Sequence, residues 1–218
     1  MQNDLYDIKV DEFNRKKTKI TFVKQHYKEL KYFSLLLYLL GIIISFFVFY
    51  QKNTELFSFL LLIPIVLTGY NIHLKRIALL GNLLVSGAIA FVLFLTLKYF
   101  FDWQAIFEFY VLMAFMLHLI REIVKDIQDK EGDKQANYYT LPIISMFLTY
   151  LVIKILVVSF WVSMVYYHEY FESIQKVVMI IISLSMIYVV MLINAEKIRT
   201  ASLILKLLML TGILTILL

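Results

Sequence analysis

Six of the seven aspartates in this 218-residue chain fall into two short clusters with identical spacing. The clusters are Asp4, Asp7 and Asp11, and Asp126, Asp129 and Asp133. Residues at positions i, i+3 and i+7 share one face of an α-helix, so each cluster would present a ladder of carboxylates. Like charges at this spacing repel one another, and a divalent cation relieves the repulsion. Mg²⁺ prefers oxygen ligands and also binds substrate phosphates. Two facing ladders therefore predict Mg²⁺ ions that bind a diphosphate.

Basic residues accompany both aspartate clusters. Arg15 follows the first cluster, Arg121 and Lys125 precede the second, and Lys75 and Arg76 lie between the two. A diphosphate needs cationic partners, and Arg can contact phosphate oxygens with two parallel hydrogen bonds. A plainer alternative is that acids and bases at helical spacing form an ordinary solvated helix surface. Two clusters of the same spacing, each flanked by bases, favour the metal site.

The composition indicates that these clusters belong to a membrane protein. Hydrophobic residues make up 61% of the chain and charged residues 17%, against about 45–50% and about 25% in a typical soluble domain. A single domain of this size has no interior large enough to bury so much apolar surface. The chain has no cysteine, which excludes a disulfide scaffold and thiolate metal sites. We therefore expect an integral membrane protein.

Continuous apolar runs predict an all-α fold, a polytopic transmembrane helical bundle with about seven spans. Each run is close to the roughly 20 residues that cross the hydrocarbon core of a bilayer. Strands are disfavoured because the runs are not alternating. The predicted spans are 32–50, 56–71, 77–97, 105–120, 141–165, 174–193 and 199–218.

The distribution of Lys and Arg predicts the orientation of these spans. Alternate loops lie on opposite sides of the membrane, and the set 1–31, 71–76, 121–140 and 194–199 holds 16 of the 21 basic residues. By the positive-inside rule this set is cytoplasmic and the C-terminus faces outward. Both aspartate clusters then face the cytoplasm. The net charge of +5 follows from topology, so no nucleic-acid partner is expected.

Two longer patterns around the aspartates resemble those of the UbiA superfamily of intramembrane prenyltransferases. Asn3-Asp4-x-x-Asp7-x-x-x-Asp11-x-x-Asn14-Arg15 resembles the first aspartate motif of that family. The segment from Arg121 to Lys134, followed by Thr140-Leu141-Pro142, resembles the second. Tyr70 with Lys75-Arg76 matches a recurrent element between the motifs. The resemblance extends over the chain from residue 2 onward.

The resemblance implies a fold, a reaction and a set of site residues. Family members are bundles of about nine transmembrane helices that transfer a prenyl group from a prenyl diphosphate, with Mg²⁺ as cofactor. It assigns metal binding to the aspartates of both clusters, and a catalytic role to Asp4, Asp7, Asp126 and Asp133. The implied diphosphate contacts are Asn3, Arg15, Tyr70, Lys75, Arg76, Arg121 and Lys125. The partners implied are the donor, a hydrophobic or amphiphilic acceptor and membrane lipids; oligomeric state is not implied.

The residues of the second motif are most similar to the corresponding motif in the branch that contains digeranylgeranylglyceryl phosphate synthases. It favours geranylgeranyl diphosphate as donor and geranylgeranylglyceryl phosphate as acceptor. An aromatic acceptor of quinone biosynthesis, such as 4-hydroxybenzoate or a naphthoate, is the alternative. The family has two helices before its first motif, whereas this chain begins inside that motif. We therefore expect residues 1–218 to be a single domain of this kind that is incomplete at its N-terminus, and inactivity of the shortened chain is a further alternative.

Two other kinds of membrane protein also use clustered acidic residues. A CDP-alcohol phosphotransferase requires a tighter pattern of Asp, Gly and Arg within one segment, and the chain lacks it. An ion transporter could use carboxylates as cation sites, but such sites usually lie near the membrane midplane. These acids lie at predicted span ends, which favours the transferase.

Overall fold

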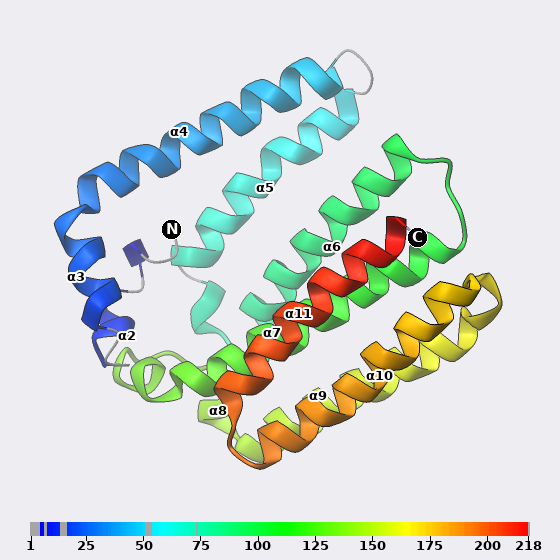
Figure 1. Ribbon diagram of the computed structural model, residues 1–218. Helices are drawn as coiled ribbons and strands as arrows, with labels where there is room; N and C mark the ends of the chain where they lie inside the picture. The colour runs from blue at the N-terminus through cyan, green and yellow to red at the C-terminus, as the bar shows by residue number, and fades with distance from the viewer. Residues whose placement is uncertain (1–4, 7, 14–16, 51–53, 73, 218) are drawn as a thin grey trace. The chain divides into compact units, whose positions relative to one another are not determined.

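Helices form almost all of the described chain in the computed structural model, which describes residues 5–6, 8–13, 17–50, 54–72 and 74–217 (Figure 1). In chain order they are α2 (Ile8–Phe13), α3 (Lys17–Gln25), α4 (Tyr27–Ser45), the π-helical turn η1 (Phe46–Tyr50), α5 (Thr54–Ile72), the 3₁₀ turn η2 (Leu74–Arg76), α6 (Leu80–Phe100), α7 (Ile106–Gln135), α8 (Leu141–Ile144), α9 (Met146–Tyr166), η3 (His168–Tyr170), α10 (Ser173–Asn194), α11 (Ile198–Leu214) and η4 (Thr215–Leu217). Within the described ranges no strand occurs, and one isolated bridge joins Ile77 to Tyr139. The all-α prediction is confirmed.

Five described helices are long and apolar enough to cross a membrane. They are Tyr27–Val48, Leu80–Phe100, Met146–Tyr166, Ser173–Asn194 and Ile198–Leu217. The two other predicted spans, 56–71 and 105–120, are also helical, as α5 and the N-terminal half of α7. The protein is an integral membrane protein.

Two of the predicted boundaries differ from the structure. The predicted span 105–120 is only the first half of α7, which continues for 30 residues through the second aspartate motif. Its charged half is rich in Glu, Lys and Gln, which are good helix formers, so the helix does not end where the apolar run ends. The predicted span 141–165 is divided at Ser145, whose backbone is extended (φ −161°, ψ 118°). The Ser145 hydroxyl accepts a hydrogen bond from Leu148 N at 3.2 Å and caps α9.

The helices form two compact units. Unit 1 contains Met1–Leu84 and Asp129–Thr140, and unit 2 contains Val85–Gln128 and Leu141–Leu218. The boundary at residues 128 and 129 falls within α7, so one helix carries the second motif through both units.

Buried aromatic rings form the core of unit 2. Phe109 of α7 is fully buried, and its ring centroid lies 4.9 Å from that of Phe171 in an edge-to-face arrangement. The fully buried Phe160 of α9 lies 6.1 Å from Phe109 on another side. Edge-to-face pairs at such separations add roughly 0.5–1.5 kcal/mol beyond the area they bury. These rings anchor α7, the helix that carries the second motif, against α9 and the segment before α10.

The backbone carbonyl of Thr215 links three segments of unit 2, near the end of α7 opposite to the second motif. The backbone oxygen of Thr215 accepts hydrogen bonds from the Tyr110 hydroxyl at 3.2 Å and from Gln175 Nε2 at 3.3 Å. Tyr110 belongs to α7 and Gln175 to α10. All three residues are buried, where an unpaired polar group is costly. These hydrogen bonds therefore fix the positions of α7, α10 and the end of α11 relative to one another within unit 2.

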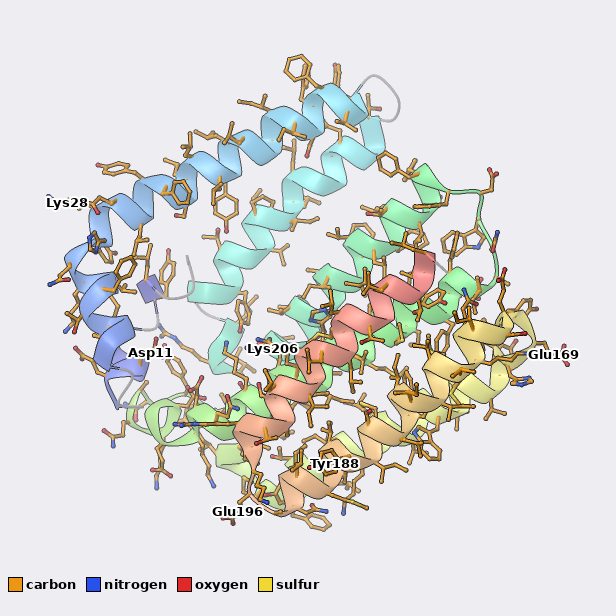
Figure 2. All side chains as sticks on the ribbon, viewed as in Figure 1. Asp11, Lys28, Glu169, Tyr188, Glu196 and Lys206 are labelled. Atoms are coloured by element: carbon orange, nitrogen blue, oxygen red, sulfur yellow. The ribbon has the colours of Figure 1, made fainter. Side chains whose placement is uncertain are left out.

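We expect Tyr110→Phe to destabilise unit 2 by removing one of these bonds. A buried hydrogen bond contributes about 0.5–1.5 kcal/mol, which corresponds to a fall of about 2–4 °C in Tm per kcal/mol for a chain of this size. Thermal unfolding of the purified protein measures the change. Tyr188→Phe is the control, because Tyr188 is 52% exposed on α10 (Figure 2). Equal Tm values for the two variants would contradict the role of the Thr215 carbonyl.

Candidate active site

The structure buries the last aspartate of each predicted motif. Asp11 on α2 is 4% exposed and Asp133 on α7 is 6% exposed. Aspartate is almost never buried to this extent unless it is paired, and both side chains have interacting neighbours. Asp126 and Asp129 are half-buried on the same helix. The continuous helix confirms the spacing argument for the second motif, since all three of its aspartates lie within α7.

Asp11, Asp129 and Asp133 belong to one compact unit although more than a hundred residues of sequence separate them. Both the N-terminal segment and residues Asp129–Thr140 are part of unit 1. Figure 2 labels Asp11 on α2, in the N-terminal part of unit 1. The tertiary structure thus gathers carboxylates of both motifs in the same unit.

The loop before α6 is fixed to the loop after α7, which brings Arg76 into the same neighbourhood. Tyr139 N donates a hydrogen bond to the carbonyl oxygen of Arg76 at 2.9 Å, and Ile77 forms a parallel bridge with Tyr139. The Arg76 guanidinium lies 5.4 Å from the centroid of the Tyr138 ring, within range of a cation–π interaction. Arg76, a predicted diphosphate contact, is therefore held near the end of the second motif.

The C-terminal turn of α7 explains how this loop reaches Arg76. Asn137 adopts a left-handed conformation (φ 56°), and Tyr138 N donates to the carbonyl oxygen of Asp133 at 2.9 Å. This is the geometry of a helix C-cap, a position that glycine usually fills. Asn tolerates positive φ better than most side chains, so Asn137 performs the role of the turn glycine. The turn directs Tyr138 and Tyr139 to the loop before α6.

In unit 2, two predicted diphosphate contacts share one acid that the sequence analysis overlooked. Glu122 pairs with Arg121 through Oε1, and its Oε2 lies 3.8 Å from Lys125 Nζ. The Glu122 side chain is only 10% exposed, whereas Arg121 and Lys125 are 26% and 35% exposed. The signal was present in the sequence, because Glu122 stands three residues before Lys125, at helical pairing distance. Glu122 therefore pairs with both cations.

Part of the predicted site lies outside the described residues. Asn3, Asp4, Asp7 and Arg15 fall there, as does the side chain of Lys75. Tyr70 is half-buried near the end of α5, and its side chain has an interacting neighbour. Among the residues that are described, no three acidic or histidine side chains form a metal-binding group. The metal assignment therefore remains a prediction that rests on both motifs together.

The donors that the motifs supply fit Mg²⁺ chemically. They are carboxylates, and Mg²⁺ takes oxygen ligands, commonly one or two carboxylates plus substrate phosphates. Asp11 and Asp133 are buried, and aspartates buried to this extent are usually paired. A divalent cation would be one such partner.

Comparison with known proteins gives a family match over nearly the whole chain. Residues 1–211 match the UbiA prenyltransferase family. The digeranylgeranylglyceryl phosphate synthase of Methanosphaera stadtmanae is 30% identical over 191 residues, which cover 85% of this chain and 68% of that protein. The synthase of the same name from Methanosarcina mazei is 38% identical over 149 residues, which cover 65% of this chain and 48% of that protein. The chain thus spans between about half and two thirds of the length of these relatives.

A solved structure shares the fold. It comes from work on digeranylgeranylglyceryl phosphate synthase in membranes, and it superposes with a TM-score of 0.69 at 25% sequence identity. The match covers 98% of this chain and 77% of that chain.

We expect Glu122→Gln to lower the stability of unit 2. The substitution keeps the shape of the side chain but leaves Arg121 and Lys125 without their shared acid. Hydrogen bonds to charged groups contribute about 1.5–3 kcal/mol, so thermal unfolding should show a fall in Tm of several degrees. Glu131→Gln is the control, because Glu131 is an exposed acid on the same helix. A Glu122→Gln protein as stable as this control would show that the ion pairs contribute nothing.

Proposed function

Because the chain belongs to the UbiA prenyltransferase family, we propose that it transfers a prenyl group from a prenyl diphosphate to a lipid acceptor bearing a glyceryl phosphate. Family membership also supports the enzyme class, a prenyltransferase with a diphosphate donor. The relatives from Methanosphaera stadtmanae and Methanosarcina mazei are named digeranylgeranylglyceryl phosphate synthases. These names support geranylgeranyl diphosphate as donor and geranylgeranylglyceryl phosphate as acceptor.

One observation carries the proposal: unit 1 contains the buried Asp11 and Asp133 together with Arg76. Carboxylates that could hold a cation and a guanidinium that could contact phosphate are what a diphosphate requires. A purely structural set of acids would be expected at the water-exposed surface.

The residues have distinct parts in the proposed reaction. Asp4, Asp7, Asp11, Asp126, Asp129 and Asp133 would hold Mg²⁺, which supplies positive charge that stabilises the departing diphosphate. Arg76, Arg121 and Lys125 would share that negative charge from fixed positions, and Lys75, Arg15, Asn3 and Tyr70 would complete the contacts. The bond from the prenyl carbon to the diphosphate oxygen breaks, and an acceptor oxygen forms the new bond to that carbon. The acceptor hydroxyl loses its proton in this step.

An apolar cavity in unit 2 has room for only a short part of a hydrocarbon chain. It measures about 110 Å³ and is lined by Leu93, Met113, Leu117 and His118, among other residues. His118 precedes Arg121 by about one helical turn, so the cavity approaches the end of the span where the cations begin. Apolar walls also exclude water, which would otherwise capture the allylic carbon.

We propose that the site faces the cytoplasm. The loops that carry the aspartate motifs also carry most of the Lys and Arg residues, and such loops are retained on the cytoplasmic side. Accessibility of a cysteine introduced at the exposed Glu131 to a membrane-impermeant reagent in sealed vesicles measures this orientation.

The experiment that tests the function incubates membranes containing the chain with labelled geranylgeranyl diphosphate and Mg²⁺. The acceptor panel contains geranylgeranylglyceryl phosphate, 4-hydroxybenzoate and dihydroxynaphthoate. We expect label to move to geranylgeranylglyceryl phosphate and to stop on addition of EDTA. Transfer to an aromatic acceptor instead would assign the chain to a different branch of the family, and transfer that persists in EDTA would exclude the metal role.

We expect Asp133→Asn to reduce prenyl transfer by about 100-fold or more, because loss of a charge-stabilising group at a reaction centre has effects of this order. Asp102→Asn is the matched control, since Asp102 is the one aspartate outside both motifs and is exposed. Turnover and the amount of membrane-inserted protein are measured together. Full turnover in Asp133→Asn would remove this residue from the site.

We expect Tyr138→Ala to raise the KM for the prenyl diphosphate about two- to fivefold, because loss of the cation–π contact, worth about 0.5–1 kcal/mol, lets Arg76 move. Tyr138→Phe retains an aromatic ring at 5.4 Å from the guanidinium and should keep the KM of the unmodified protein. If both variants raise KM equally, the hydroxyl rather than the ring is what positions the site.

A further inference from the structure

Unit 1 contains a pocket whose described lining combines polar and apolar side chains, next to Leu5 and Tyr6 of the first motif segment. The pocket measures about 260 Å³ and lies at the start of α4. We name it the mouth; its polar lining residues are Tyr6, Tyr27, Lys31, Tyr32, Ser34 and Tyr38. Leu5 and Tyr6, which stand between Asp4 and Asp7 in the sequence, form its wall on the motif side.

An apolar groove continues from the mouth between α4 and α5. It measures about 160 Å³, and its lining includes Tyr38, Gly41, Ser45, Leu61 and Pro64. We name it the trough. Tyr38 lines both cavities, so the two cavities adjoin at this residue. A ring contact between Phe46 and Phe57, with centroids 5.7 Å apart, links the two segments further along.

The chemistry of the two cavities changes along one direction. The mouth offers the Lys31 ammonium and several phenol hydroxyls, whereas most of the trough lining is aliphatic. The Ser34 hydroxyl already donates to the carbonyl oxygen of Lys31 at 2.8 Å. Lys31 and Ser45 are separated by 14 positions of one helix, or about 21 Å at 1.5 Å per residue. This is more than half of the roughly 30 Å hydrocarbon thickness. A ligand that fills both cavities therefore has a polar head at the membrane surface and a chain that points into the bilayer.

We infer that the mouth and the trough form a binding site for a lipid with a phosphate head and a long hydrocarbon chain. Phosphate oxygens accept hydrogen bonds from ammonium and hydroxyl donors, and charge-assisted bonds of this kind are the strong ones. Tyrosine suits the position because its ring is apolar and its hydroxyl is polar, as at membrane interfaces. No ion pair to Lys31 is recorded within the described ranges, so its charge is available to a phosphate.

Gly41 leaves the trough open. A Cβ atom placed at Gly41 would meet no other atom within 4 Å. Gly41 lines the trough, so we expect a leucine at this position to occupy part of the space that a hydrocarbon chain would fill. Gly41→Leu therefore tests binding of the lipid's hydrocarbon chain, and Lys31→Gln tests binding of its phosphate head.

Two sources could supply this lipid: the surrounding bilayer, or the lipid acceptor of the proposed reaction. Both carry phosphate and a hydrocarbon chain, so the site itself does not depend on prenyl transfer. A ligand at the mouth would press against Leu5 and Tyr6, and so would support the segment that carries the first motif.

The test is native mass spectrometry of the purified full chain in mild detergent with dioleoyl phosphatidic acid. We expect a bound phosphatidic acid that resists dilution, weaker binding of dioleoyl phosphatidylcholine, and none of glycerol phosphate, which lacks a chain. Lys31→Gln and Gly41→Leu should each weaken phosphatidic acid binding about tenfold or more, which corresponds to loss of about 1.4 kcal/mol or more. Binding that is unchanged in both variants would overturn the inference, as would equal binding of glycerol phosphate.

Two control variants test whether weakened binding of phosphatidic acid is specific to the mouth and the trough. Lys28→Gln removes an exposed lysine from the first turn of the same helix but not from the mouth (Figure 2). Gly87→Leu adds the same bulk at an open glycine of α6 that lines neither cavity. Both controls should bind phosphatidic acid as the unmodified protein does; weakening in these controls equal to that in the test variants would overturn the inference.

A second measurement needs no variant. A phosphatidic acid with a photoreactive group on its chain should label peptides from α4 and α5 in the unmodified protein, and labelling confined to other helices would overturn the site. The two sources are then separated by competition with geranylgeranylglyceryl phosphate. Displacement of phosphatidic acid identifies the acceptor as the occupant, and its absence identifies a bilayer lipid; both outcomes retain the site.

Discussion

The protein must keep carboxylates next to a hydrocarbon environment, and much of its local structure follows from this constraint. Asp11 and Asp133 are withdrawn from water almost completely, yet a buried charge is costly unless it is neutralised. The same unit contains Arg76, which is held by the backbone bond from Tyr139 and by the ring of Tyr138. Both acids have interacting neighbours, so neither is left without a partner in the interior.

Helix α7 is the element through which this constraint acts. Its first half is apolar and packs through Phe109 and Tyr110 into the aromatic core of unit 2, while its second half carries the acids and bases of the second motif. Packing of the apolar half fixes that half within unit 2, whereas the last turns of the helix belong to unit 1. Glu122, at the transition, is buried and pairs with the cations on both of its sides. The helix thus carries both core residues of unit 2 and the charged residues of the second motif.

The family relationship and the pockets are relevant to how the chain could bind a lipid. UbiA prenyltransferases as a family act at the membrane, and the described part of this chain offers both charged groups and apolar cavities within single units. In unit 1 the lining of the mouth includes Leu5 and Tyr6, which stand between two aspartates of the first motif in the sequence. A lipid bound there would contact the segment that carries this motif.

Several features could be predicted from the sequence because they depend on local pattern alone. Continuous apolar runs identified the helices, since a chain in lipid must satisfy its backbone hydrogen bonds internally. The spacing of Asp126, Asp129 and Asp133 is helical, and all three lie within α7. The hydropathy pattern, by contrast, missed the break at Ser145 and the continuation of α7, because hydropathy reports where a segment is apolar and not where hydrogen bonding ends.

What the sequence by itself determined is the membrane class, the helical fold, the family and the chemical types of the site residues. Only the tertiary structure decided that Asp11 and Asp133 are buried in one unit, that Tyr138 faces Arg76, and that Tyr38 joins two cavities. The physical reason is distance along the chain. Helical periodicity relates residues within a few turns, whereas contacts between remote segments depend on packing and on turns such as the one at Asn137.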